Sequence, residues 1–145
     1  MMNWKRIIIA AIVFAIIAQV IHTVESMLTM DFYMDEAYLG VWSKLMMPVA
    51  GPPPAEFFYV SIVSGVIIAL IYAAVYDLVN NSLSGKTTIK KGLQYGIILF
   101  LMVQIPGLLA MYLLVNLPAM LLVYWGISSL VISLIGGIVI AKIVK

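Results

Sequence analysis

The sequence predicts an all-α membrane protein, a single domain over residues 1–145 in which four transmembrane helices form an antiparallel bundle. Two observations predict this class. Hydrophobic residues make up 65% of the chain and charged residues only 10%, whereas soluble domains are about half apolar and about a quarter charged. The apolar residues also gather in stretches that reach the ~20 residues needed to cross a bilayer core. These stretches are residues 7–28, 57–79, 89–115 and 118–142.

The basic residues predict the orientation of the chain in the membrane. An even number of spans places both chain ends and the middle connection on one side of the bilayer. Seven of the eight basic residues then share that side: Lys5, Arg6, Lys86, Lys90, Lys91, Lys142 and Lys145. Since basic residues concentrate on the cytoplasmic side, we expect a multi-pass protein of the cytoplasmic membrane with both termini in the cytoplasm.

Residues 29–55 form the long connection between the first two spans, and this orientation places it outside the cell. Asp31 could cap a short helix there, with Met34 and Trp42 on an apolar face that lies at the membrane surface. Such a segment could be a lid over the bundle or a plain interfacial connector, and its composition favours the connector.

Small residues at every fourth position predict where the helices pack, because close backbone approach favours helix association in lipid. Ser61, Gly65 and Ala69 form one such stripe, and Ser133 and Gly137 belong to another. A four-span bundle has little interior of its own. Some stripes could therefore face a second copy in a homo-oligomer, or a partner in a larger membrane complex.

Ionisable groups inside a membrane helix are costly and are candidates for function. His22 and Glu25 lie about one turn apart in the outer third of the first span, with Gln19 one turn earlier and Thr29 one turn later. Gln104 lies near the middle of the third span. These residues predict a polar pocket that binds a proton, an ion or a small molecule for transport or sensing. Alternatively, the polar side chains only hold the helices in register.

Methionines near this pair suggest another kind of site. Met27 and Met30 lie close in sequence to His22 and Glu25, and thioether and imidazole ligands together suit Cu(I). Two copies of His22 in a dimer could also hold a haem. Methionine is commonly a flexible apolar filler, so a copper or haem protein is the weaker interpretation and the cofactor stays unknown.

Other function classes are disfavoured by what the sequence lacks. The chain has no cysteine, which excludes disulfides, cysteine-bound zinc and iron–sulfur clusters. A single histidine beside one carboxylate forms no nucleophile–base–acid set, so the sequence leans against an enzyme. The spread basic residues and the net charge of +2 form no nucleic-acid footprint. The lipid bilayer is the expected partner, and an accessory or structural subunit of a membrane complex is the alternative function.

Residues 85–96 combine a basic turn with a glycine-containing helix start, Gly-Lys-Thr-Thr-Ile-Lys-Lys-Gly-Leu-Gln-Tyr-Gly. Together with the layout of the spans, this segment resembles a pattern in small uncharacterised prokaryotic four-span membrane proteins. The resemblance implies a fold and a membrane location. It implies no activity that could be assigned to a residue.

Overall fold

The computed structural model describes residues 2–49 and 51–144, and this part of the chain consists of helices and the turns that join them. Four helical segments are long and apolar enough to cross a membrane, which confirms the four predicted spans. They are α1 (Trp4–Leu28), α3 (Ala55–Val79) with η2 (Asn80–Ser82), α4 (Thr88–Leu99) with η3 (Phe100–Gln104) and α5 (Ile105–Leu114), and α6 (Ala119–Val144). Two short helices, α2 (Met30–Met34) and η1 (Glu36–Val41), follow α1.

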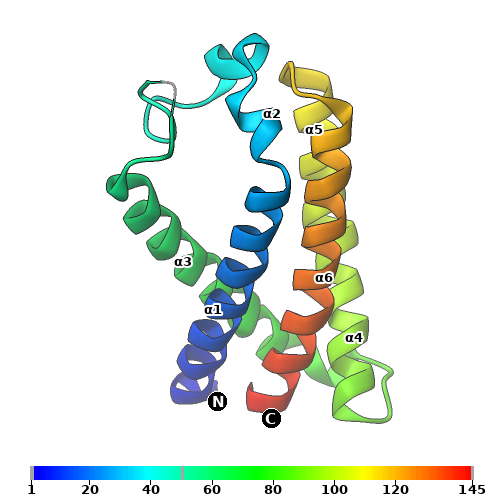
Figure 1. The fold of residues 1–145 in the computed structure, drawn as a ribbon. Helices are drawn as coiled ribbons and strands as arrows, with labels where there is room; N and C mark the ends of the chain where they lie inside the picture. Colours follow the sequence, from blue (N-terminus) through cyan, green and yellow to red (C-terminus); the bar gives the residue numbers. More distant parts are fainter. Residues whose placement is uncertain (1, 50, 145) are drawn as a thin grey trace.

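The long helix α6 lies between α1 on one side and α4 on the other, and α3 packs against α1 (Figure 1). Both chain ends lie at the same end of the molecule, called the inner end below. The helices α2 and η1 lie at the opposite, outer end. The fold therefore depends on three helix contacts, those of α6 with α4, of α6 with α1 and of α1 with α3.

The contact between α4 and α6 brings the two backbones together. A Cβ atom added to Gly92 would lie 2.6 Å from the Cα of Ile138, and one added to Gly137 would lie 2.8 Å from the backbone nitrogen of Gly96. A Cβ on Gly96 would collide with the backbone oxygen of Ser133. Ser133 and Gly137, two residues of the predicted stripes, thus lie where the helices approach most closely.

Phe14 joins three helices at the centre of the core. Its ring lies where a Cβ of Gly136 on α6 would be, so glycine makes room for it. The same ring packs edge-on against Tyr72 of α3, with ring centroids 5.9 Å apart. Phe14 is only 5% exposed, and it therefore fixes α1 between its two neighbours.

The helix α3 packs through its inner half only. Ala69 and Ala73 are fully buried, but Ser61 is half-buried, and a Cβ added to Gly65 would meet no described atom within 4 Å. At Gly65, the outer half of this predicted stripe therefore meets no described part of another helix. The connections explain the difference, since a short turn ties the end of α3 to α4, whereas the long connection from α1 lets its start lean away (Figure 1).

The third span is interrupted by one wide helical turn. The backbone N–H of Ile105 donates to the carbonyl of Phe100, five residues earlier, which makes η3 a π-helix. Pro106 follows directly, and its ring would clash with a carbonyl held in regular α-helical position four residues before it. The wide turn accommodates this ring, and it places Gln104, which is half-buried, at its last position.

The outer connection differs from the single capped helix that the sequence suggests. Asp31 lies inside the first turn of α2. The side-chain cap is made instead by Asp35 at the start of η1, where its carboxylate accepts from the N–H of Ala37 at 2.9 Å. The buried side chain of α2 is Tyr33 rather than Met34. Two short helices with a bend at Asp35 let this segment fold back over the outer end.

We expect the glycine contact between α4 and α6 to dominate stability. Gly96→Ala should lower the free energy of unfolding by about 1–3 kcal/mol, because the new methyl group overpacks a backbone contact. Gly65→Ala is the matched control, and it should leave stability unchanged or raise it by about 0.5–1 kcal/mol, since alanine favours helix. Chemical unfolding in mixed micelles, followed by circular dichroism, measures both. Equal effects of the two substitutions would contradict this packing.

Candidate functional site

A chain of buried polar side chains crosses from α1 to α6 near the outer end. Glu25, Thr29 and Tyr33 succeed one another at intervals of four residues, so they follow one face of α1 and continue it into α2. They are 8%, 0% and 9% exposed. Trp125 of α6 completes the chain from the neighbouring helix.

Hydrogen bonds join these groups in two pairs, Trp125 with Tyr33 and Thr29 with Glu25. The indole N–H of Trp125 donates to the Tyr33 hydroxyl oxygen at 3.0 Å. The Thr29 hydroxyl lies 2.9 Å from a carboxyl oxygen of Glu25 and 2.8 Å from the backbone oxygen of the same residue. A threonine hydroxyl has one hydrogen to donate, so it can satisfy only one of these two oxygens at a time.

Tyr33 links the buried carboxyl group to the aromatic residues of the outer end. Burial raises the pKa of its hydroxyl, the charge of Glu25 raises it further, and the hydrogen bond from Trp125 opposes the shift. Tyr33 therefore keeps its proton at neutral pH and can act as a donor. Its ring stacks on Trp42, with centroids 4.9 Å apart. The indole nitrogen of Trp42 is buried and has no hydrogen-bond partner among the described residues.

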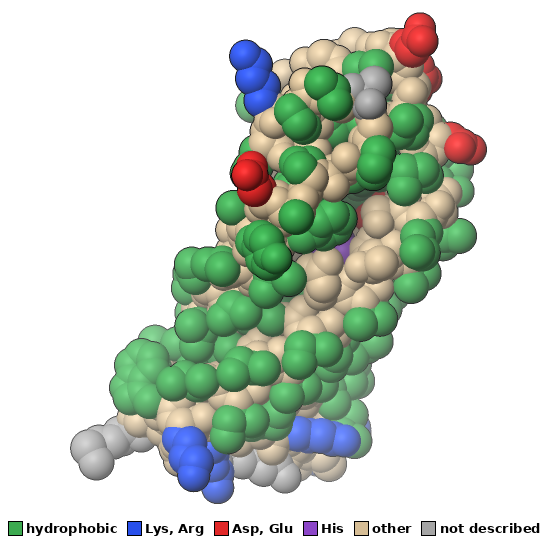
Figure 2. Space-filling view, turned by 60° about the vertical axis from the view of Figure 1, so that its left-hand side comes forward, with side chains coloured by type: hydrophobic (Ala, Val, Ile, Leu, Met, Phe, Trp, Pro, Cys, Tyr) green, Lys and Arg blue, Asp and Glu red, His purple; other side chains and the backbone are tan. Residues whose placement is uncertain are grey.

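The predicted polar residues differ in exposure. Glu25 is buried, whereas His22, about one turn earlier, is exposed, and Figure 2 shows the histidine bordered by hydrophobic side chains. The two residues are close enough for their charges to interact. Gln19 and Gln104 are both half-buried, on α1 and at the end of η3. Each lies outside the hydrogen-bonded pairs described above, because their positions fall on other faces of the helices.

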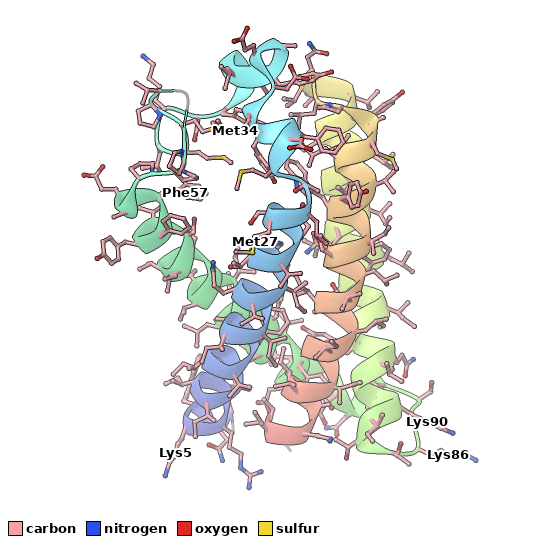
Figure 3. All side chains as sticks on the ribbon, in the orientation of Figure 1. Lys5, Met27, Met34, Phe57, Lys86 and Lys90 are labelled. Carbon is pink, nitrogen blue, oxygen red and sulfur yellow. The ribbon has the colours of Figure 1, made fainter. Side chains whose placement is uncertain are left out.

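The methionines lie apart from the buried carboxyl group. Met27 is 70% exposed and Met30 is 43% exposed. Figure 3 shows Met27 and Met34 on the side of α1 and α2 that faces the start of α3 near Phe57. Within residues 2–49 and 51–144, no three side chains of histidine, cysteine, aspartate or glutamate gather as a metal site would require. A metal held by His22, Glu25 and these methionines therefore stays a prediction from sequence.

Tyr33 and Trp125 are the site residues that sequence reasoning missed. Tyr33 carries a signal, because it continues the spacing of Glu25 and Thr29 by another four residues. That signal was hidden by the expectation that the helix restarts at Asp31. Trp125 carries no signal, since its neighbour lies 92 residues away in the chain.

Comparisons of the chain with protein-family models, with curated proteins and with solved structures give no match. The chemistry of the site must therefore follow from its own groups. A buried carboxyl group with a hydroxyl beside it can hold a proton or a small cation. They contain no activated nucleophile.

The hydrogen bond between Tyr33 and Trp125 should tie the outer segment to α6. We expect a double-mutant cycle of Tyr33→Phe and Trp125→Phe to give a coupling of about 1 kcal/mol in the free energy of unfolding, the usual contribution of such a bond. In the control cycle, Tyr33→Phe with Trp4→Phe, the coupling should be near zero, because Trp4 is exposed at the start of α1, far from Tyr33, and distant sites are additive. Additive effects in both cycles would contradict the bond.

Proposed function

We propose that the protein is an antiparallel four-helix module of the cytoplasmic membrane, with both termini in the cytoplasm, which binds a proton or small cation at Glu25 for sensing or transport. One observation carries this proposal. The Glu25 carboxyl group is buried in the outer half of a membrane span, and its hydrogen-bond partner is the neutral hydroxyl of Thr29.

The distribution of charge supports the orientation. Lys5, Lys86 and Lys90 all lie at the inner end of the molecule (Figure 3). Basic residues concentrate on the cytoplasmic side of membrane proteins, so the inner end is the cytoplasmic one. Glu25 and the short helices α2 and η1 then lie toward the outside.

The balance of charge supports binding at Glu25. A buried carboxylate is costly unless a cation or hydrogen-bond donors compensate it. Thr29 supplies one hydrogen for two Glu25 oxygens. A proton on the carboxyl group would turn the second contact into a hydrogen bond, and a bound cation would compensate the charge directly. The proton or the cation must therefore come from outside the pair formed by Glu25 and Thr29.

His22 suits a role in the exchange of protons with the surroundings. It is exposed and lies about one turn before Glu25 on α1. An imidazole nitrogen can accept a proton and give it up again. His22 can therefore pass protons between the surface of α1 and the buried carboxyl group.

A second candidate function is an accessory subunit or homo-oligomer. It is favoured by the outer half of α3, where Gly65 meets no described atom within 4 Å. A partner helix seated on Ser61 and Gly65 would bury this surface. A native mass spectrum in mild detergent distinguishes the two candidates, because a subunit would be released together with its partner and an independent module would not.

The Glu25 proposal is tested by infrared difference spectroscopy of the protein during a pH titration. As the pH falls, the wild-type protein should show a carboxyl band at the high frequency of a buried group, separate from the bands of its exposed carboxylates, and Glu25→Gln should remove this band. Glu56→Gln is the matched control, because Glu56 is an exposed carboxylate in the first turn of α3, and it should keep the band. Adding sodium chloride or tetramethylammonium chloride during the titration separates a cation site from a proton site. At a cation site, a cation that competes with the proton for Glu25 would shift the pH at which the band appears. At a proton site, neither salt would shift it.

Loss of the band in both variants, or in neither, would contradict the proposal. Circular dichroism of each variant establishes that the helices are intact. His22→Ala should keep the band and change only its pH dependence, because the exposed imidazole exchanges protons and does not hold them at the buried site.

A further inference from the structure

A cavity of about 340 Å³ lies at the inner end, far from Glu25, where the end of α3, the start of α4 and the end of α6 meet. Its volume falls within the range of about 300–1,000 Å³ that is common for small-molecule sites. Both polar and apolar side chains line it: Tyr76, Asp77, Asn80, Lys86, Thr87, Thr88, Lys91, Ala141 and Val144.

One wall of this cavity is cationic. The amino group of Lys91 donates to the backbone oxygen of Asn80 at 2.8 Å, which holds it on the wall and leaves two of its three hydrogens free. Lys86 is exposed and lines the same cavity. The lysines outnumber Asp77, which is the carboxylate among the lining residues. The cavity therefore carries a net positive charge.

Thr87 adds a hydroxyl donor to the cationic wall. Its oxygen accepts from the backbone N–H of Lys90 at 3.3 Å. A hydroxyl that accepts a hydrogen bond keeps its own hydrogen to donate. Two ammonium groups and a hydroxyl on one wall are the donors that bind phosphate oxygens.

Apolar residues also line the cavity. Ala141 and Val144 of α6 are 0% and 4% exposed, and Tyr76 of α3 is 4% exposed. A site lined by both donors and apolar surface suits a phosphate joined to a carbon backbone. It suits a free inorganic ion less well.

We propose that this cavity binds a phosphate-bearing anion, supplied by the head group of an anionic phospholipid in the inner leaflet. That leaflet carries the anionic lipids, and basic pockets between transmembrane helices on the cytoplasmic side bind such head groups. The proposal rests on the orientation proposed above, but it is independent of the chemistry at Glu25, because the two sites lie at opposite ends of the bundle.

The test measures lipid binding to the delipidated full chain in mild detergent by native mass spectrometry. Phosphatidylglycerol should bind, and zwitterionic phosphatidylcholine should bind at least several-fold more weakly. Lys86→Gln and Lys91→Gln should each raise the dissociation constant of phosphatidylglycerol about tenfold, as expected for loss of a charge-assisted hydrogen bond.

Lys90→Gln is the matched control. Lys90 is exposed and lies on the same turn of α4, but it does not line the cavity. Its loss should change the dissociation constant by no more than about twofold, since its ammonium group lies outside the cavity lining and acts only as a screened surface charge. Asp77→Asn should strengthen binding, because it removes the negative charge of the lining. If Lys91→Gln prevents folding, Lys86→Gln carries the test, because the Lys86 side chain is exposed.

Competition identifies the source of the phosphate. Glycerol phosphate and inorganic phosphate, added to the lipid complex, should displace phosphatidylglycerol only weakly if the apolar lining contributes to binding. Full displacement by inorganic phosphate would overturn the lipid assignment in favour of a soluble anion. An equal loss of binding in Lys90→Gln and Lys86→Gln would overturn the cavity site altogether, because it would show a diffuse attraction to the basic end.

Discussion

The close contact between the backbones of α4 and α6 supports the rest of this structure. Apolar side chains gain little by leaving lipid for one another, so membrane helices depend on close packing and hydrogen bonds. Gly92, Gly96 and Gly137 allow that packing, because any Cβ there would collide with the facing backbone. With α6 fixed in this way, Gly136 on its other side accepts the ring of Phe14 and positions α1.

The two ends of the bundle differ in chemistry because the same helices carry different side chains there. At the outer end, a buried carboxyl group bonded to a hydroxyl on α1 lies one turn before a tyrosine that is bonded to an indole of α6. At the inner end, α4 and α6 border a cavity lined by Lys86 and Lys91. The rigid contact between α4 and α6 connects the two regions, so a displacement of α6 would affect both.

Part of the candidate site could be predicted from sequence, and part could not. Glu25 stands out because a carboxylate in an apolar span is rare and costly, and the spacing to Thr29 places both on one face. The same reasoning grouped His22 with Glu25, although a separation of three residues turns the second side chain by about 60° around the helix. This rotation is enough to leave His22 exposed and to bury Glu25. Trp125 could not be foreseen, since its partner comes from a distant part of the chain.

The sequence by itself determined the class of the protein and the number and approximate limits of its spans, because both follow from the length and composition of the apolar stretches. It also marked the small residues that allow close packing, but a stripe does not say which helix it meets. Only the tertiary structure decided that Gly137 faces Gly92 and Gly96, whereas Gly65 faces no described helix. The physical reason is that a small residue permits an approach without causing it. The lengths of the connections and the fit of bulky side chains such as Phe14 decide which helices meet.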